Sequence, residues 1–322
     1  MESVLKRSPF FNIKTMIKKI IIVFIFFYVC INNSYSQQDP HYTQYTYNMN
    51  IVNPAYAGSR GTLSISALYR TQWVGLDGSP ETATFAIHAP VGKNLGMGFS
   101  VISDKIGPVK EQNIYADFSY TVSTSEEGRL AFGLKGGITL LDIGLVSLIL
   151  PQDPDDPLFR DNVNLSDPNF GAGIYYYTEK FYAGLSAPNL IETVHFEKDG
   201  GTLSKASEKM HYFVTTGYVF DLSENLKFKP SVMAKAVSGS PLSIDVSANF
   251  LMNERLELGA NYRFGDSVSG MVNFGVTPDL RMGYAYDYTT TNLGDFNSGT
   301  HEIFLLWDID FSKKNLKSPR FF

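Results

Sequence analysis

The feature that most constrains this 322-residue chain is a series of short segments in which apolar residues alternate with polar or small ones. From about residue 61 onward there are fourteen such segments, separated by clusters of turn-forming residues. A period of two is the pattern of a β-strand with two different faces. We therefore predict an all-β, antiparallel fold of about 14 strands. The segments are 63–69, 83–89, 95–101, 114–122, 130–140, 170–176, 181–187, 210–220, 226–234, 242–250, 256–264, 268–276, 280–288 and 303–311.

Polar and charged residues occupy the positions between the apolar ones. In a soluble sandwich these charges would face water and the apolar set would form the core. In a transmembrane barrel the apolar side chains face lipid and the charges line a lumen. Alternation alone does not choose between the two arrangements. Representative polar positions are Thr82, Thr84, His88, Asp117, Lys135, Lys227, Lys229, Lys235, Asp245, Glu257, Arg263, Arg281, Asp287, Glu302 and Asp308.

Three features favour the transmembrane barrel. The segments are long enough to cross a bilayer at a tilt. Aromatic residues gather toward their ends, as interfacial girdles require. The connections also alternate in length, with long ones at 141–168, 188–208 and 290–299 and tight turns between them. We predict an outer-membrane barrel over 61–311, with its long loops extracellular and both termini in the periplasm.

Residues 1–36 have the layout of a secretory signal peptide. Lys14, Lys18 and Lys19 precede an apolar run, and Ser34 and Ser36 supply small residues before the predicted cleavage point. Met16 is an alternative start, and a retained N-terminal anchor is the alternative to cleavage. The residues before Cys30 are too large for a lipid-attachment motif.

Cleavage after position 36 would leave 22 basic and 31 acidic residues and remove the only cysteine. The resulting net charge of about −9 makes the mature chain a poor ligand for nucleic acid, because phosphate binding needs positive charge. Without cysteine, the mature chain has neither disulfide nor thiolate chemistry.

Two segments lie outside the alternating pattern. Residues 37–60 are polar but contain four tyrosines, and Asn53-Pro54 is a turn-forming pair. We expect this segment to fold into the mouth or lumen of the barrel as a plug, with a flexible periplasmic leader as the alternative. Residues 312–322 form a basic tail ending in Arg320, Phe321 and Phe322. This periplasmic tail would dock a partner or serve as an insertion signal.

Four stretches of the mature chain carry a resemblance to a known family. They are the mature N-terminus, the Asn53-Pro54-Ala55-Tyr56-Ala57-Gly58 element, the Arg70-Thr71-Gln72-Trp73 stretch and the Pro319-Arg320-Phe321-Phe322 end. Together they resemble the PorP/SprF family of type IX secretion outer-membrane proteins over essentially the whole mature chain. The resemblance implies an accessory barrel that assists export or surface anchoring of a large cargo protein, such as an adhesin with a type B C-terminal targeting domain. It also implies contacts with other secretion components and, in some members, a role in gliding motility. The expected partner-binding residues are Asn53, Pro54, Tyr56, Arg70, Trp73, Arg320, Phe321 and Phe322.

Other groups of residues give weaker indications of function. The acidic and amide residues between Asp153 and Asn169 do not have EF-hand spacing and are expected to form a solvated loop. The five histidines lack metal-ligand spacing, and no G-x-S-x-G motif is present. We therefore expect no enzyme, cofactor or metal site. The inward charges could line an open pore or pair across strands, so a channel for small solutes is the alternative function.

Overall fold

The computed structural model describes residues 40–147, 162–191 and 209–311. Residues 37–238 and 242–322 form one compact unit, to which everything below belongs. The predicted signal peptide, the tail at 312–322 and half of the Asp153–Asn169 cluster lie outside the described residues. Asn164, Asp167 and Asn169 of that cluster belong to a strand over Val163–Tyr177, so the expected loop is shorter than predicted.

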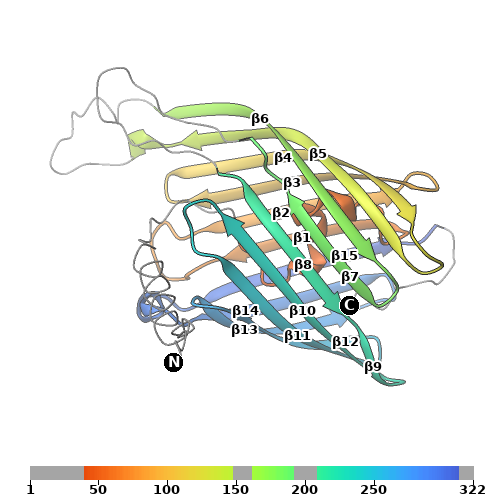
Figure 1. Ribbon diagram of the computed structural model, residues 1–322. Helices are drawn as coiled ribbons and strands as arrows, with labels where there is room; N and C mark the ends of the chain where they lie inside the picture. Colours follow the sequence, from red (N-terminus) through yellow and green to blue (C-terminus); the bar gives the residue numbers. More distant parts are fainter. Residues whose placement is uncertain (1–39, 148–161, 192–208, 312–322) are drawn as a thin grey trace, which may run out of the picture. The chain divides into compact units, whose positions relative to one another are not determined.

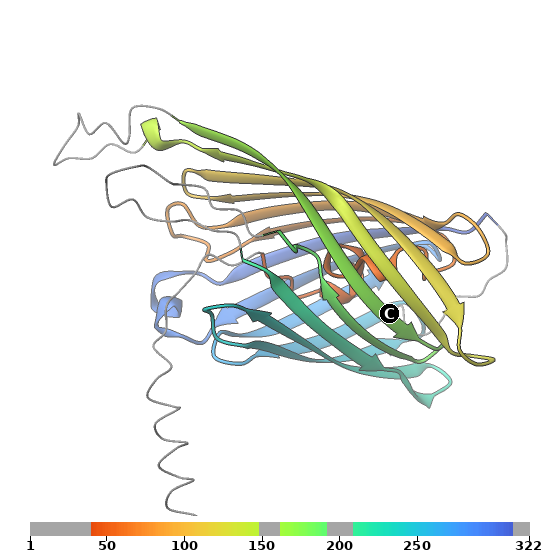
Figure 2. The ribbon, with the colours of Figure 1, turned by 45° about the horizontal axis from the view of Figure 1, so that its top comes forward.

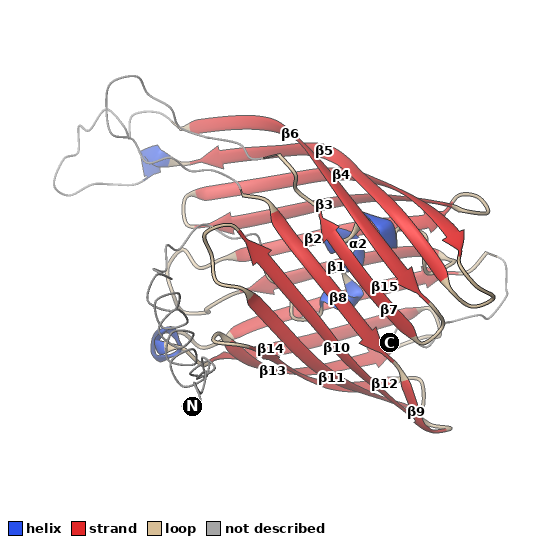
Figure 3. Ribbon diagram, viewed as in Figure 1, coloured by secondary structure: helices blue, strands red, loops and turns tan. Residues whose placement is uncertain are grey.

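Fourteen antiparallel strands form a closed ring, which confirms the predicted barrel (Figures 1 and 3). Each strand pairs with its neighbour along the chain, and the pairing of β1 with β15 closes the ring. The short strand β9 is additional; it follows β8 after Val219 and pairs with β10. The bounds are β1 Leu63–Thr71, β2 Glu81–Pro90, β3 Leu95–Ile106, β4 Val109–Ser123, β5 Arg129–Ile143, β6 Val163–Tyr177, β7 Phe181–Ala187, β8 His211–Tyr218, β9 Phe220–Ser223, β10 Leu226–Val237, β11 Ser243–Met252, β12 Leu256–Arg263, β13 Ser267–Gly275, β14 Leu280–Thr289 and β15 Thr300–Ile309.

The two faces of the wall have opposite polarity, and the apolar face is outside. On β13, for example, Val268 and Val272 are exposed whereas Ser269 and Asn273 are buried. This is the arrangement of a barrel surrounded by lipid, and closure leaves no unpaired strand edge along most of the wall. Among the described residues, no helix is long and apolar enough to span a membrane.

The two ends of the barrel differ. At one, the loop end, lie residues 72–80, 144–147, 188–191 and 290–299; at the other, the turn end, lie short turns such as 91–94, 178–180 and 253–255. The first strand begins and the last strand finishes at the turn end, on the right of Figure 1. The chain therefore leaves the barrel wall at the turn end.

Residues 40–60, called here the inner segment, lie inside the barrel (Figure 2). They form three short helical turns, η1 (Tyr45–Tyr47), α2 (Met49–Val52) and η2 (Pro54–Tyr56). The Asn53 side chain accepts a hydrogen bond from the Ala55 N–H at 2.9 Å and so caps η2, where proline at the first position needs no donor. Two further short helices, η3 (Leu145–Ser147) and η5 (Asn292–Phe296), lie in loop-end connections.

The inner segment runs along the barrel from one end to the other. Thr43 bonds to Glu302, near the start of β15 at the loop end, whereas Arg60 bonds to Asp308, near the finish of β15 at the turn end. The first described residue, Pro40, therefore lies toward the loop end and Phe311 lies at the turn end. The ends of the mature chain lie outside the described residues, so the expectation that both termini are periplasmic stays a prediction.

Candidate functional site

The inner segment supplies much of the buried apolar cluster of the protein. Tyr45 is 1% exposed and Ala55 is fully buried. The ring of Tyr47 stacks on Phe304 of β15, with centroids 4.2 Å apart and an interplanar angle of 16°. Tyr56 meets Tyr175 of β6 edge to face at 5.4 Å. The segment thus fills the lumen as a hydrophobic core fills a soluble domain.

Wall glycines allow the inner segment to approach the sheet closely. At each of three inward positions, an added Cβ would come within 3.0 Å of the segment, a separation that real Cβ atoms essentially never show. The obstructing atoms include backbone, which cannot rotate away. The wall is therefore shaped around this particular stretch of chain. The close approaches are Gly96 of β3 to Ala57, Gly133 of β5 to Pro54 and Ala55, and Gly173 of β6 to Asn53.

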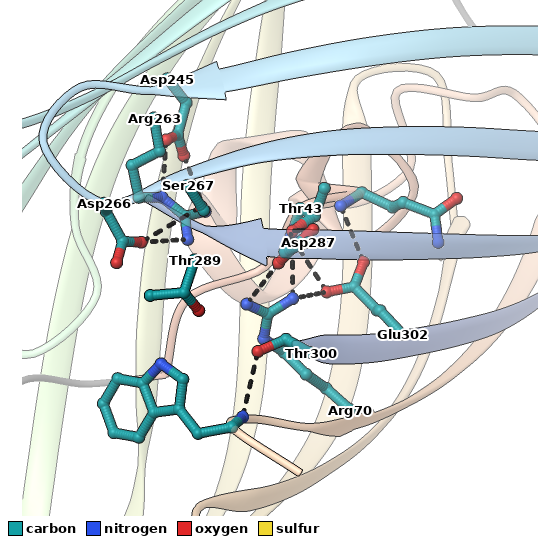
Figure 4. A network of polar contacts seen from close by, with 12 residues as sticks. Thr43, Arg70, Asp245, Arg263, Asp266, Ser267, Asp287, Thr289, Thr300 and Glu302 are labelled. Carbon is teal, nitrogen blue, oxygen red and sulfur yellow. Dashed lines mark hydrogen bonds and ion pairs between the residues drawn. The ribbon is translucent and has the colours of Figure 1, made fainter. Parts of the chain in front are cut away.

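An ion-pair network holds the loop-end part of the inner segment (Figure 4). The guanidinium of Arg70 on β1 lies 2.8 Å from Asp287 of β14 and 3.0 Å from Glu302 of β15. Glu302 also accepts the backbone N–H groups of Thr43 and Gln44 at 3.0 and 2.7 Å. The Thr43 hydroxyl donates to Asp287 at 2.7 Å. One arginine and two carboxylates, all buried, thereby fasten two consecutive residues of the segment to the wall.

A second network lies in the middle of the lumen. Lys135 of β5 and Asp117 of β4 form a fully buried pair at 3.1 Å. The side-chain amide of Asn50 in the inner segment donates to Asp117 at 3.0 Å. Removal of the segment would take the Asn50 donor away from a buried carboxylate, so this hydrogen bond favours retention of the segment.

Further ion pairs extend toward both ends. Glu257 of β12 accepts the hydroxyl of Tyr47 and lies 3.4 Å from Arg281 of β14. Arg60 pairs with Asp308, its Nε lying 2.9 Å from Oδ1. The inward charges predicted from the sequence thus pair with one another or bind the segment. A further pair, seen in Figure 4, joins Arg263 of β12 to Asp245 of β11 at 2.7 Å and to Asp266 at 3.2 Å.

His41 is partly exposed and lies near the start of the inner segment, among positively charged side chains. Burial is the largest cause that lowers the pKa of His41 well below its ordinary value, followed by the charges of Lys235, Arg263, Arg70 and His211. The imidazole is therefore neutral at pH 7.

The residues expected to bind a partner fall into three groups. Asn53, Pro54, Tyr56 and Arg70 are buried contacts between the segment and the wall. Trp73 lies partly exposed in the loop after β1, with φ of 47°. Its backbone N–H donates to the Thr300 hydroxyl at 3.2 Å. The remaining three, Arg320, Phe321 and Phe322, lie outside the described residues. Partner binding by this set stays a prediction.

Sequence reasoning did not single out the wall glycines or the two carboxylates that meet Arg70. The carboxylates were recognised as inward-facing, but nothing local in the sequence connects Asp287 and Glu302 to a residue more than 200 positions earlier. In the described part of the chain, no group of histidine, cysteine and carboxylate side chains could hold a metal ion.

A closed antiparallel barrel with an apolar outer face and a polar, occupied interior defines an outer-membrane β-barrel protein. A family model described as "Type IX secretion system membrane protein PorP/SprF" matches residues 34–307. The chain belongs to this family, and membership implies association with type IX secretion components.

Solved structures with a similar fold are outer-membrane barrels. They include the "CymD monoaromatic hydrocarbon channel" (9% identity, 81% of this chain and 92% of that chain, TM-score 0.48) and the Ralstonia pickettii toluene transporter TbuX (9%, 80% and 92%, 0.47). A Pseudomonas aeruginosa FadL homologue is also similar (10%, 84% and 95%, 0.44). At these identities the likeness concerns the fold only. No curated protein matches the chain in a sequence comparison.

Proposed function

We propose that this protein is an accessory barrel of the type IX secretion system that assists the export or surface anchoring of a large cargo protein, such as an adhesin. Family membership supports the secretion role. From the family resemblance we also propose that the cargo carries a type B C-terminal targeting domain and that the protein is linked to gliding motility.

The observation that carries the mechanism is the occupied lumen. The inner segment is held along the barrel by fitted glycine contacts and by hydrogen bonds to Glu302 and Asp117, the carboxylates of the buried ion pairs at Arg70 and Lys135. A polypeptide in transit would have to displace all of these contacts. We infer that the segment acts as a plug, and that the barrel engages cargo through its external surfaces.

The occupied lumen also bears on the alternative, a channel for small solutes. The same fitted contacts disfavour free passage through the centre of the barrel. Conductance of the purified, intact barrel in planar bilayers tests this alternative directly. Substantial single-channel currents would favour the channel over the plugged accessory barrel.

The proposed orientation has the loop end at the cell surface and the turn end in the periplasm, because outer-membrane barrels carry their longer loops outside. Pro40 then lies toward the surface side. Single cysteines test this proposal: Asp295→Cys in η5 should react with an impermeant maleimide on intact cells. Lys93→Cys, in the turn after β2, should react only after the outer membrane is permeabilised. The reverse result would invert the orientation.

The role in secretion is tested by quantitative surface proteomics on a clean deletion strain. Loss of one or a few large exported proteins, restored by the wild-type gene, is the expected result and identifies the cargo. An unchanged surface proteome would refute the accessory role under those growth conditions.

A further inference from the structure

The inner segment contacts strands from the first half of the barrel wall. The Ser119 hydroxyl of β4 donates to the Ala57 carbonyl at 2.6 Å. The Asn53 side chain donates to the Ile174 carbonyl of β6 at 3.0 Å. Together with the hydrogen bond to Asp117 and the close approach of three wall glycines, these bonds fix the segment on β3 to β6.

The last strand, β15, faces the same segment along most of its length. Its inward side chains from Glu302 onward are Glu302, Phe304, Leu306 and Asp308, each at most 8% exposed. Glu302 accepts two backbone N–H groups of the segment, Phe304 stacks on a tyrosine of the segment, and Asp308 pairs with Arg60. Leu306 belongs to the same buried apolar cluster as the segment. The inner face of the strand that closes the ring is therefore packed against the segment.

The two sets of contacts differ in the length of chain between the partners. Hydrogen bonds of the segment with β2 to β7 join residues between 30 and 134 positions apart. Those with β12, β14 and β15 join residues between 210 and 259 positions apart. The entropic cost of closing a loop grows with its length, and this cost must be met before distant contacts stabilise the chain. Docking of the segment on the early strands therefore precedes pairing of β1 with β15.

We propose that the inner segment has a further function as an intramolecular template for closure of the barrel. It docks on β2 to β7 as these strands pair, and its remaining contacts then capture β15. Because Gly61 and Thr62 alone separate the segment from β1, a strand held by the segment lies within reach of β1.

The buried charges of the β1–β15 seam support this order. Thr43 of the segment accepts a hydrogen bond from Arg70 of β1 and donates its backbone N–H to Glu302 of β15, both at 3.0 Å. A docked segment therefore offers partners to both charges while they are being removed from water, when an unpaired charge is most costly. The plug acts in the finished barrel, whereas the template acts while the barrel forms.

The test follows pairing of β1 with β15 while the urea-unfolded chain of residues 37–322, which contains no cysteine, folds in detergent micelles. Ala67→Cys with Leu305→Cys places two thiols at directly paired, outward positions of the seam. Dibromobimane, which becomes fluorescent when it bridges two neighbouring thiols, reports their approach. The matched control pair, Ala248→Cys with Ala260→Cys, reports pairing of β11 with β12, which are neighbours along the chain.

Deletion of residues 40–58 should slow the β1–β15 signal about tenfold and leave the β11–β12 signal unchanged. A tenfold change is expected when one charge-assisted hydrogen bond is lost from the transition state for closure. Tyr47→Ala, which removes the ring that stacks on Phe304, should slow the β1–β15 signal in the same selective way.

Equal β1–β15 rates in the intact chain and the deletion variant would overturn the proposal, because closure would then precede docking. Equal slowing of both cysteine pairs would also overturn it, since the segment would then only stabilise the chain as a whole. If the deletion variant does not fold, Tyr47→Ala decides the question alone. This proposal is independent of the secretion role, because neither fluorescence signal involves cargo.

Discussion

Gly133→Ala tests whether the wall is shaped to hold the inner segment. The added methyl group would overlap the backbone of Pro54 and Ala55, which cannot move aside as a flexible side chain could. Either the segment shifts out of its place or the wall at β5 deforms. We expect the segment to shift, since β5 is paired on both sides along its length.

The size of the effect follows from the clash. Overpacking a filled site costs about 1–3 kcal/mol, and a clash with backbone belongs in the upper half of that range. The conformational entropy that alanine saves relative to glycine acts through the unfolded chain, so it cancels between the docked and undocked states, in both of which the wall is folded. The loss of docking free energy is then about 2–3 kcal/mol, which raises the undocked population by a factor of about 30–150.

Chymotrypsin digestion of the folded barrel in detergent measures this population, because the segment contains Tyr42, Tyr45 and Tyr47. The initial cleavage rate in the segment should rise in Gly133→Ala by the same factor. Gly270→Ala is the matched control: it is also a strand glycine, but its added Cβ would meet nothing within 4 Å. In a chain lacking residues 40–58, Gly133→Ala should have no destabilising effect. Equal cleavage rates in the two alanine variants would refute the fitted-wall argument.

Three further predictions concern the charges and the lumen. Arg70→Ala leaves two buried carboxylates without their partner and should cost about 3–5 kcal/mol of unfolding free energy. The control Lys180→Ala removes an exposed pair with Asp221 and should have little effect. Comparable losses of unfolding free energy in denaturant titrations would contradict this difference. Deletion of residues 40–58 should convert a non-conducting barrel into one with stable currents in planar bilayers, and a silent deletion variant would show that something else closes the lumen. Because the pKa of His41 is lowered in the folded state, the undocked chain binds the proton more readily, so docking is strongest above the ordinary histidine pKa of about 6.5 and weakens as pH falls below it. The rate of chymotrypsin cleavage of the segment, divided by its rate on an unfolded peptide at the same pH, should rise as the pH falls from 7.5 to 5.5. His41→Gln should flatten that rise, and an unchanged pH profile in the variant would exclude His41 as the cause.

The alternating pattern by itself determined the all-β fold class and the approximate strand positions; together with segment length, aromatic placement and the alternating loop lengths, it also predicted which face of each strand meets lipid. These properties are local: a period of two assigns every residue to one of two faces, and long and short connections alternate along the chain. The inward charges could also be identified, as Lys135 and Asp287 illustrate. The sequence motifs also identified the family, which the match to residues 34–307 confirmed.

What occupies the lumen was decided only by the tertiary structure. Four tyrosines in a polar stretch indicated that residues 37–60 pack against something, but not whether that is the mouth or the interior. The path from loop end to turn end depends on contacts between residues far apart in sequence, such as Thr43 with Glu302 and Asn53 with Gly173. A strand glycine looks the same in the sequence whether it meets backbone, as Gly133 does, or open space, as Gly270 does. The strand register and the closure of the ring bring such positions together, and local periodicity carries no information about which of them will meet.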